Sequence, residues 1–366
     1  MNLSQITETL ETFAPLQYQE HYDNAGLIIG NKNSEIKNIL ICLDVTEEVL
    51  DEAITKGCNL IIAHHPIIFF PLKKINGNNF VERIVIKSIQ NNISIYAAHT
   101  NLDNVKNGVN AKICEKLGLK NCKIISPKKN LLRKIISFCP TEYAVSVRQA
   151  LFAAGAGHIG EYDECSFNSA GTGTFRASEN TNPFVGEQGK QHQEQELKIE
   201  TIYPTHLENK ILKALFSSHP YEEVAYDIIP LENKNPLVGS GMVGELEVEK
   251  NEKEFLNFLK EKMKTSCIKH TKLFNKPIKK VAVCGGAGSF LLKDAILNGA
   301  DIFISSDFTY HQFFDAENKI IIADIGHYES EQFTSEIFFN LLKENFPDLN
   351  ICVTEKNTNP VNCFLI

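Results

Sequence analysis

Short apolar runs alternate with helical patterns near both ends of this chain, and this alternation restricts its fold more than any other feature. Residues 37–43 (KNILICL), 58–63 (CNLIIA) and 93–98 (ISIYAA) are apolar runs of strand length. Between them, residues 45–57 and 81–92 carry apolar side chains at helical spacing, and Gly57 is a stop signal for the first helix. This order predicts a parallel α/β sheet that helices cover on both faces.

The same rhythm returns in the last third of the chain. Apolar runs predict strands at 279–284, 301–305 and 319–324, and 350–355 (NICVTE) is expected to be the closing strand of this segment. Helical patterns occupy 291–300 and 328–346. We therefore expect two pseudo-related parallel-sheet α/β segments, residues 1–126 and 233–366, which together form one discontinuous domain.

The middle of the chain, residues 127–232, has a different pattern and is predicted to be an inserted domain. Polar, proline-bearing stretches flank it. Strands are predicted at 133–140, 197–204 and 223–231, and helices at 141–155 and 205–219, an order that fits a ferredoxin-like α+β unit. The polar section 155–195 is expected to hold long loops and short strands, with a mobile tip at 187–196 (EQGKQHQEQE).

Polar clusters follow three of the predicted strands. His64 and His65 follow 58–63, His99 and Asp103 follow 93–98, and the pair His327 and Glu331 follows 319–324. Ligands of open parallel sheets bind at the carboxyl ends of strands. The pair at positions i and i+4 would share one face of a helix.

Imidazole and carboxylate ligands together suit zinc, iron, manganese or cobalt, and a carboxylate can bridge two ions. We predict a shared metal site from His64, His65, Asp103, His327 and Glu331, with His99 as a supporting partner rather than a ligand. A single histidine at a strand end is more often only hydrogen-bonded.

Several of these residues have a second interpretation. Asp103 could cap the helix that follows it, and Asp44 could cap the next helix or orient a ligand histidine. The glycine-rich 284–290 (CGGAGSF) is either an anion-binding turn or a tight turn between a strand and a helix. His219, Glu222 and Glu223 form either a second binding site or a charged turn before a strand.

Composition and charge exclude some classes of protein. The 366 residues are 43% hydrophobic and 22% charged, as in globular proteins, and the net charge of -8 argues against nucleic acid or anionic membrane as a partner. Ten scattered cysteines include no C-x-x-C pair and favour a reducing compartment. No signal peptide and no apolar run of about 20 residues is evident, so a cytoplasmic location is expected.

The motifs YDNAGLIIG, CLDVTEEVLDEAI, IIAHHPIIF, AAHTNLD, CGGAGSF and DIGHYESE resemble, in this order, the Nif-three-like family, also known as GTP cyclohydrolase I type 2 homologs. AGAGHIGEYDECSF, GTGTF, NPFVG and HPYEEVAYDIIPL are similar to the inserted domain of its long form, which is akin to PII-type signalling proteins. The resemblance implies a homohexamer and two divalent metal ions per chain, bound by the five residues above, with Glu331 as the bridge. Asp23 and Asn24, otherwise turn formers, would then lie near the metals.

The resemblance also implies a function. Metal-dependent hydrolysis of a nucleotide is expected, such as the ring opening of GTP, with His311 or Asp307 moving protons. The sequence departs from the family where Ser305 and Ser306 precede Asp307 in place of Thr-Gly. The alternative is a regulatory or metal-handling scaffold without catalysis, whose inserted domain senses a small ligand.

Overall fold

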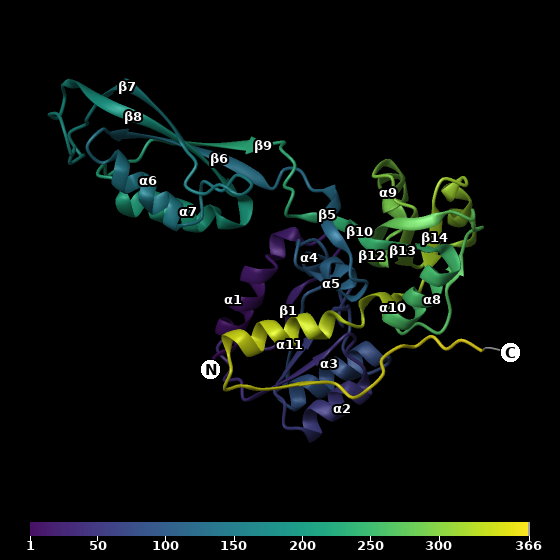
Figure 1. Ribbon diagram of the computed structural model, residues 1–366. Helices are drawn as coiled ribbons and strands as arrows, with labels where there is room; N and C mark the ends of the chain where they lie inside the picture. The colour runs from purple at the N-terminus through teal and green to yellow at the C-terminus, as the bar shows by residue number, and fades with distance from the viewer. Residues whose placement is uncertain (365–366) are drawn as a thin grey trace. The chain divides into compact units, whose positions relative to one another are not determined.

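The computed structural model describes residues 1–364, which form two compact units. The first unit combines Met1–Pro127 with the described residues from Pro236 onward, and the second is Lys128–Asn235. Both units mix helices and sheets (Figure 1). No helix within the described residues is both long and apolar enough to cross a bilayer.

The first sheet of the first unit has the strand order β1-β4-β3-β2-β15 and is parallel except at β1, which pairs antiparallel with β4. Its strands are β1 (Gly26–Ile29), β2 (Asn38–Cys42), β3 (Leu60–Ala63), β4 (Ser94–Ala97) and β15 (Asn350–Val353). The expectation that 350–355 closes the C-terminal segment is wrong, because β15 pairs with β2. The helix before β15 packs on β2 and brings the chain back to the open edge of the first sheet.

The second sheet has the order β11-β14-β13-β12-β10-β5. Its strands are β5 (Lys120–Pro127), β10 (Gly239–Asn251), β11 (Lys269–His270), β12 (Pro277–Ala287), β13 (Ile302–Ser306) and β14 (Ile321–Asp324). The central strands β12, β13 and β14 are parallel, as predicted, whereas β5, β10 and β11 add antiparallel pairs. Each sheet therefore has a parallel centre, with antiparallel pairing at one edge of the first sheet and on both sides of the second.

The helices of the first unit cover these sheets. They are α1 (Leu3–Phe13), η1 (Leu16–Tyr18), α2 (Glu47–Thr55), α3 (Phe80–Gln90), α4 (Thr100–Asp103), α5 (Val109–Lys116), α8 (Glu252–Lys262), η3 (Ser289–Leu291), α9 (Leu292–Leu297), η4 (Tyr310–Ala316), α10 (His327–Glu331) and α11 (Thr334–Asn345). The helix predicted at 328–346 is divided, since α10 ends at Glu331 and α11 begins at Thr334. A core typical of an α/β sheet packs Leu40 and Ile61 against Leu50 and Ile84 of the covering helices.

The second unit is a four-stranded antiparallel sheet with two main helices on one face (Figure 1). Its elements are β6 (Leu132–Pro140), α6 (Ala144–Ala153), β7 (Phe167–Arg176), β8 (Gln191–Pro204), η2 (Thr205–Leu207), α7 (Glu208–Ser218) and β9 (Tyr226–Leu231), with the sheet order β7-β8-β6-β9. Inward-facing residues such as Ile135 and Ile199 pack against Val147, Leu151 and Ile211 of the helices.

The section 155–195 is more regular than the sequence predicts. Strand β7 pairs with β8 over its whole length, and the predicted tip 187–196 is in strand from Gln191 onward. Most side chains of β7 are exposed on both faces, so the strand lacks the alternation of apolar residues that sequence analysis detects.

Candidate metal centre

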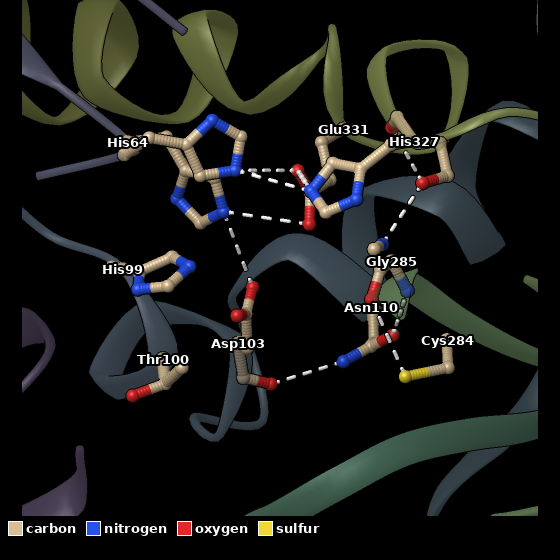
Figure 2. A network of polar contacts seen from close by, with 12 residues as sticks. His64, His99, Thr100, Asp103, Asn110, Cys284, Gly285, His327 and Glu331 are labelled. Atoms are coloured by element: carbon tan, nitrogen blue, oxygen red, sulfur yellow. Dashed lines mark hydrogen bonds and ion pairs between the residues drawn. The ribbon is translucent and has the colours of Figure 1, made fainter. Parts of the chain in front are cut away.

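Parallel strands of the two sheets bring five polar residues together at one place in the first unit. His64 and His65 follow β3, Asp103 ends α4 shortly after β4, and His327 and Glu331 lie on α10 just after β14. Figure 2 shows the imidazole of His64 directed toward the carboxylates of both Asp103 and Glu331. The carboxyl ends of strands from both sheets therefore meet here, as the sequence predicts.

The Glu331 carboxylate lies between two groups of side chains. Its Oε1 is 3.7 Å from Nε2 of His64, which is also 3.6 Å from Oδ1 of Asp103. Its Oε2 is 3.0 Å from Nε2 of His65 and 3.0 Å from Nε2 of His327. Each group presents three ligand atoms within 4.8 Å of one another, so each could hold one metal ion.

His99 lies close enough to this centre to be a further candidate ligand, whereas the sequence predicts only a supporting role. One ring nitrogen of His99 is within 4.8 Å of ligand nitrogens of His64 and His65. Its Nδ1 is 2.7 Å from Oδ1 of Asp23. Asp23 also accepts hydrogen bonds from the backbone N–H and the hydroxyl of Thr100. Burial raises the pKa of Asp23, but its hydrogen bonds with His99 and Thr100 outweigh this effect and lower the pKa to about 2.

The Nδ1 atom of each histidine faces an acceptor outside the centre. His64 Nδ1 lies 2.8 Å from the carbonyl oxygen of Ala98, and His65 Nδ1 lies 2.7 Å from Oδ1 of Asp44. His327 Nδ1 lies 2.6 Å from Oδ2 of Asp307. These acceptors assign the proton of a neutral imidazole to Nδ1, so the lone pair of each Nε2 points into the centre, as metal-ligating histidines require.

The buried atoms of the centre lack partners within the described residues. Nε2 of His64, Oδ1 of Asp103 and Oε2 of Glu331 are buried without a properly aligned hydrogen bond. Buried lone pairs that face one another are costly unless a cation or a proton lies between them. Imidazole nitrogens with carboxylate oxygens match the preferences of borderline divalent metals, so the residues present fit a metal ion.

Protons would neutralise the centre when no metal is bound. Burial lowers the pKa of His65, but its contacts with Asp44 and Glu331 outweigh this effect and raise the pKa to about 10. Burial likewise opposes protonation of His327, whereas Asp307 and Glu331 raise its pKa to about 11. Burial and the Glu331 charge raise the pKa of Asp103 well above its usual value. Protons on these groups would therefore have to leave when a metal binds.

The glycine-rich segment 284–290 leaves space for the Glu331 carboxylate and does not form an anion-binding site. Gly286 has a φ of +62°, and a Cβ there would overlap Oε1 of Glu331. The backbone N–H of Gly285 donates to Oδ1 of Asn110 (Figure 2). The backbone N–H of Gly286 donates to Oγ of Ser330. Because these N–H groups already have acceptors, the interpretation as an anion-binding turn is wrong for this structure.

The structure also decides two capping questions. Thr46 caps α2 by accepting from Val49, whereas Asp44 bonds His65 and so has the orienting role. Asp103 lies at the end of α4, and the N-cap of α5 is Gly108, so Asp103 is not a helix cap.

The two candidates for proton transfer occupy different environments. Asp307, with a φ of +59°, bonds His327, and this hydrogen bond lowers its pKa. His311 is exposed on η4, with its ring against Tyr310 and Phe314, and is not among the groups that meet at the centre.

A cavity of about 500 Å³ opens beside the centre. His65, His99, Asp307 and His327 line it together with the C-terminal segment at Asn359–Val361. The Thr358 hydroxyl donates to Oδ2 of Asp44 (2.8 Å), and Nδ2 of Asn359 donates to Oε1 of Glu329 (3.1 Å). The sequence gives no sign that this C-terminal segment lines the cavity, because only the pairing of β15 with the first sheet brings it here.

Known proteins match this chain over nearly its whole length. Residues 1–360 match the model of the Duf34/NIF3 (NGG1p interacting factor 3) family. The GTP cyclohydrolase 1 type 2 homolog of Bacillus subtilis (strain 168) is 40% identical over 366 residues, which cover 98% of each chain. That of Listeria monocytogenes serovar 1/2a is 36% identical over 364 residues, 97% of each chain.

Solved structures of similar proteins share the fold. A Bacillus cereus protein related to NIF3 superposes with a TM-score of 0.86 at 38% identity, covering all of this chain and 99% of its own. Staphylococcus aureus protein SA1388 has a TM-score of 0.79 at 28% identity, with the same coverage.

Proposed function

Because this chain belongs to the Duf34/NIF3 family, we propose that its histidine and carboxylate cluster is a dinuclear divalent-metal centre that hydrolyses a nucleotide. The observation that carries the proposal is the convergence of three atoms that are buried without an aligned hydrogen bond, from His64, Asp103 and Glu331, with the Nε2 atoms of His65 and His327. The two oxygens of Glu331 face different ligand groups, which supports its role as the bridge.

In the proposed centre, His65 and His327 would hold one ion, His64 and Asp103 would hold the other, and Glu331 would contribute to both groups. Zinc, iron, manganese and cobalt all suit this donor set. Asp44 and Asp307 hold the Nδ1 protons of two of the histidines, which fixes the ring orientation before an ion arrives.

The proposed substrate follows from the relatives, which are named GTP cyclohydrolase 1 type 2 homologs. Paired divalent ions would supply Lewis acidity and lower the pKa of a bound water, which suits the hydrolytic opening of a purine ring or cleavage of a phosphoester. Asp307 lines the cavity and, with its lowered pKa, is an ionised proton acceptor at neutral pH. His311 is the other candidate for moving protons and would need to reach the substrate from η4.

Turnover by metal-reconstituted protein tests this function. GTP and related nucleotides are offered to the wild type, to His65→Ala and to Asp103→Ala. We expect activity only in the wild type and in the control His158→Ala, which alters an exposed histidine of the second unit. Equal activity in the wild type and in both site variants would contradict the proposal, as would metal analysis that finds no ions.

A regulatory or metal-handling scaffold without catalysis is the second candidate function. The observation that favours it is a separate compact unit, Lys128–Asn235, with a cavity of its own. In this proposal the unit is a ferredoxin-like, PII-like insert that senses a small ligand, and the chain assembles as a cytoplasmic homohexamer. Assays that stay blank across nucleotides for fully metallated protein would favour this candidate, and a monomer by light scattering would contradict the assembly.

A further inference from the structure

A cavity of about 680 Å³ lies in the second unit, on the sheet face opposite the helices. Residues alternate along β8, so that Leu197 and Ile199 pack into the helix-covered core while Glu196 and Lys198 point to the other face. Phe138 of β6 pairs with Lys198 and shares that face. These outward residues form the floor of the cavity, which we call the sheet pocket.

Glu196 is the buried polar group of the sheet pocket. It is 9% exposed, and its Oε1 accepts a hydrogen bond from the hydroxyl of Tyr221 at 2.9 Å. Its Oε2 has no hydrogen-bond partner within the described residues. Gly173 of the neighbouring strand leaves the space that Oε2 occupies, since a Cβ at this position would overlap the carboxylate. The second oxygen of this nearly buried carboxylate is thus available to accept from a ligand in the pocket.

Aromatic side chains line the pocket around this carboxylate. Phe175 and Phe184 both contact Tyr221, with ring centroids 6.1 and 6.3 Å apart, and Phe138 contributes a further ring. Flat apolar groups pack well between such rings, and the faces of the rings attract cations.

The groups nearest Glu196 leave its charge without a matching cation. His219 is neutral, because its Nδ1 accepts from the backbone N–H of Tyr221 and its Nε2 donates to the carbonyl of Phe138, and burial lowers its pKa. Lys198 pairs with Glu200.

The rim of the pocket carries both signs of charge. Arg176 lies at the end of β7, and it is opposed by two further carboxylates, those of Glu222 and Glu223. Oε1 of Glu222 accepts from the backbone N–H of Asn182. The lining as a whole therefore favours a positively charged ligand over an anion.

We propose that the sheet pocket binds a small organic cation with a flat apolar body, such as an aromatic amidine or amine. The cationic N–H groups donate to Oε2 of Glu196, and the flat body lies among the rings of Phe138, Phe175, Phe184 and Tyr221. This site gives the scaffold hypothesis a ligand class and does not depend on the metal centre, so either can fail without the other.

Three segments that resemble the inserted domain of the long-form family members meet at this pocket. Residues 171–175 (GTGTF) supply Gly173 and Phe175, residues 182–186 (NPFVG) supply Phe184, and the segment that begins at His219 supplies Tyr221. We therefore favour the interpretation that the segment of His219, Glu222 and Glu223 belongs to a second binding site, rather than being only a charged turn before a strand.

Titration of metal-free, full-length protein with three probes of one shape tests the charge requirement. Benzamidine is cationic, benzamide is neutral and benzoate is anionic. We expect benzamidine to bind at least tenfold more tightly than benzamide, and benzoate not to bind, as measured by calorimetry or by NMR shifts. Equal binding of benzamide, preferential binding of benzoate, or no binding of benzamidine would overturn the proposal.

Variants then locate the site. Glu196→Gln should weaken benzamidine binding roughly ten- to a hundredfold, because a charge-assisted hydrogen bond is replaced by a neutral one. Gly173→Ala should have a similar effect by displacing the carboxylate. The control Glu187→Gln alters an exposed carboxylate of the same unit and should bind like the wild type. Circular dichroism confirms folding, and unchanged affinity in folded Glu196→Gln protein would overturn the proposed site.

Discussion

The Nε2 atoms of His65 and His327 lie 3.3 Å apart, while the Nδ1 atom of each ring is bound to a carboxylate. With both Nδ1 protons held by Asp44 and Asp307, two lone pairs face each other beside the buried Glu331. Such an arrangement is stable only when a positive charge lies among these atoms, either a proton or a metal ion.

Competition between protons and metal follows from this arrangement. His65 and His327, with pKa values of about 10 and 11 in the metal-free protein, bind protons at neutral pH that a metal must displace. Apparent metal affinity should therefore rise with pH from 6 to 9, and uptake should release about one to two protons per chain. Calorimetry in buffers of different ionisation enthalpy measures this release, and an affinity that falls with rising pH would contradict the prediction.

The same pKa values predict the pH dependence of the metal-free protein. Both are raised above the value of about 6.5 for an unfolded histidine, so their stabilising effect is complete below that pH and is lost as pH rises through 10 to 11. Chelated protein should thus unfold at lower denaturant concentration at pH 10 than at pH 7, whereas metal-loaded protein should show a smaller change. Denaturation curves at the two pH values compare the two forms.

The convergence of the five candidate ligands could be predicted from the sequence, because parallel strands bring their carboxyl ends to one edge and the motif residues follow directly. The supporting contacts could not. The space that Gly286 leaves for the Glu331 carboxylate and the hydrogen bond from the Thr358 hydroxyl to Asp44 exist only in the tertiary fold, in which β15 joins a distant sheet. The long hairpin of the second unit was missed because its exposed residues carry no periodic apolar signal.

The C-terminal segment should tune the metal centre. Thr358→Val removes the hydroxyl that donates to Asp44, the carboxylate that orients His65, and we expect metal affinity to fall by a few-fold. Asp44→Asn removes the charge itself and should lower the affinity by about ten- to a hundredfold. Competition with a chromophoric chelator measures both values. Thr358→Ser retains the hydroxyl and should restore wild-type affinity; if it binds as weakly as Thr358→Val, the hydrogen bond is not responsible.

Substitution of Gly286 can distinguish the effect of backbone strain from the effect of a displaced Glu331 carboxylate. Gly286→Ala introduces a Cβ at a φ of +62° and pushes it against Oε1 of Glu331. Gly299→Ala is the matched control, since Gly299 has a φ of +70° but no atom within 4 Å of the added Cβ.

Both substitutions should destabilise the protein by about 1 kcal/mol or more through the left-handed backbone. Only Gly286→Ala should also lower the metal content, because it displaces the carboxylate that faces both ligand groups. Elemental analysis after dialysis against trace metal, together with melting temperatures, distinguishes the two effects. Equal metal content in the two variants would show that the position of the Glu331 carboxylate does not control metal binding.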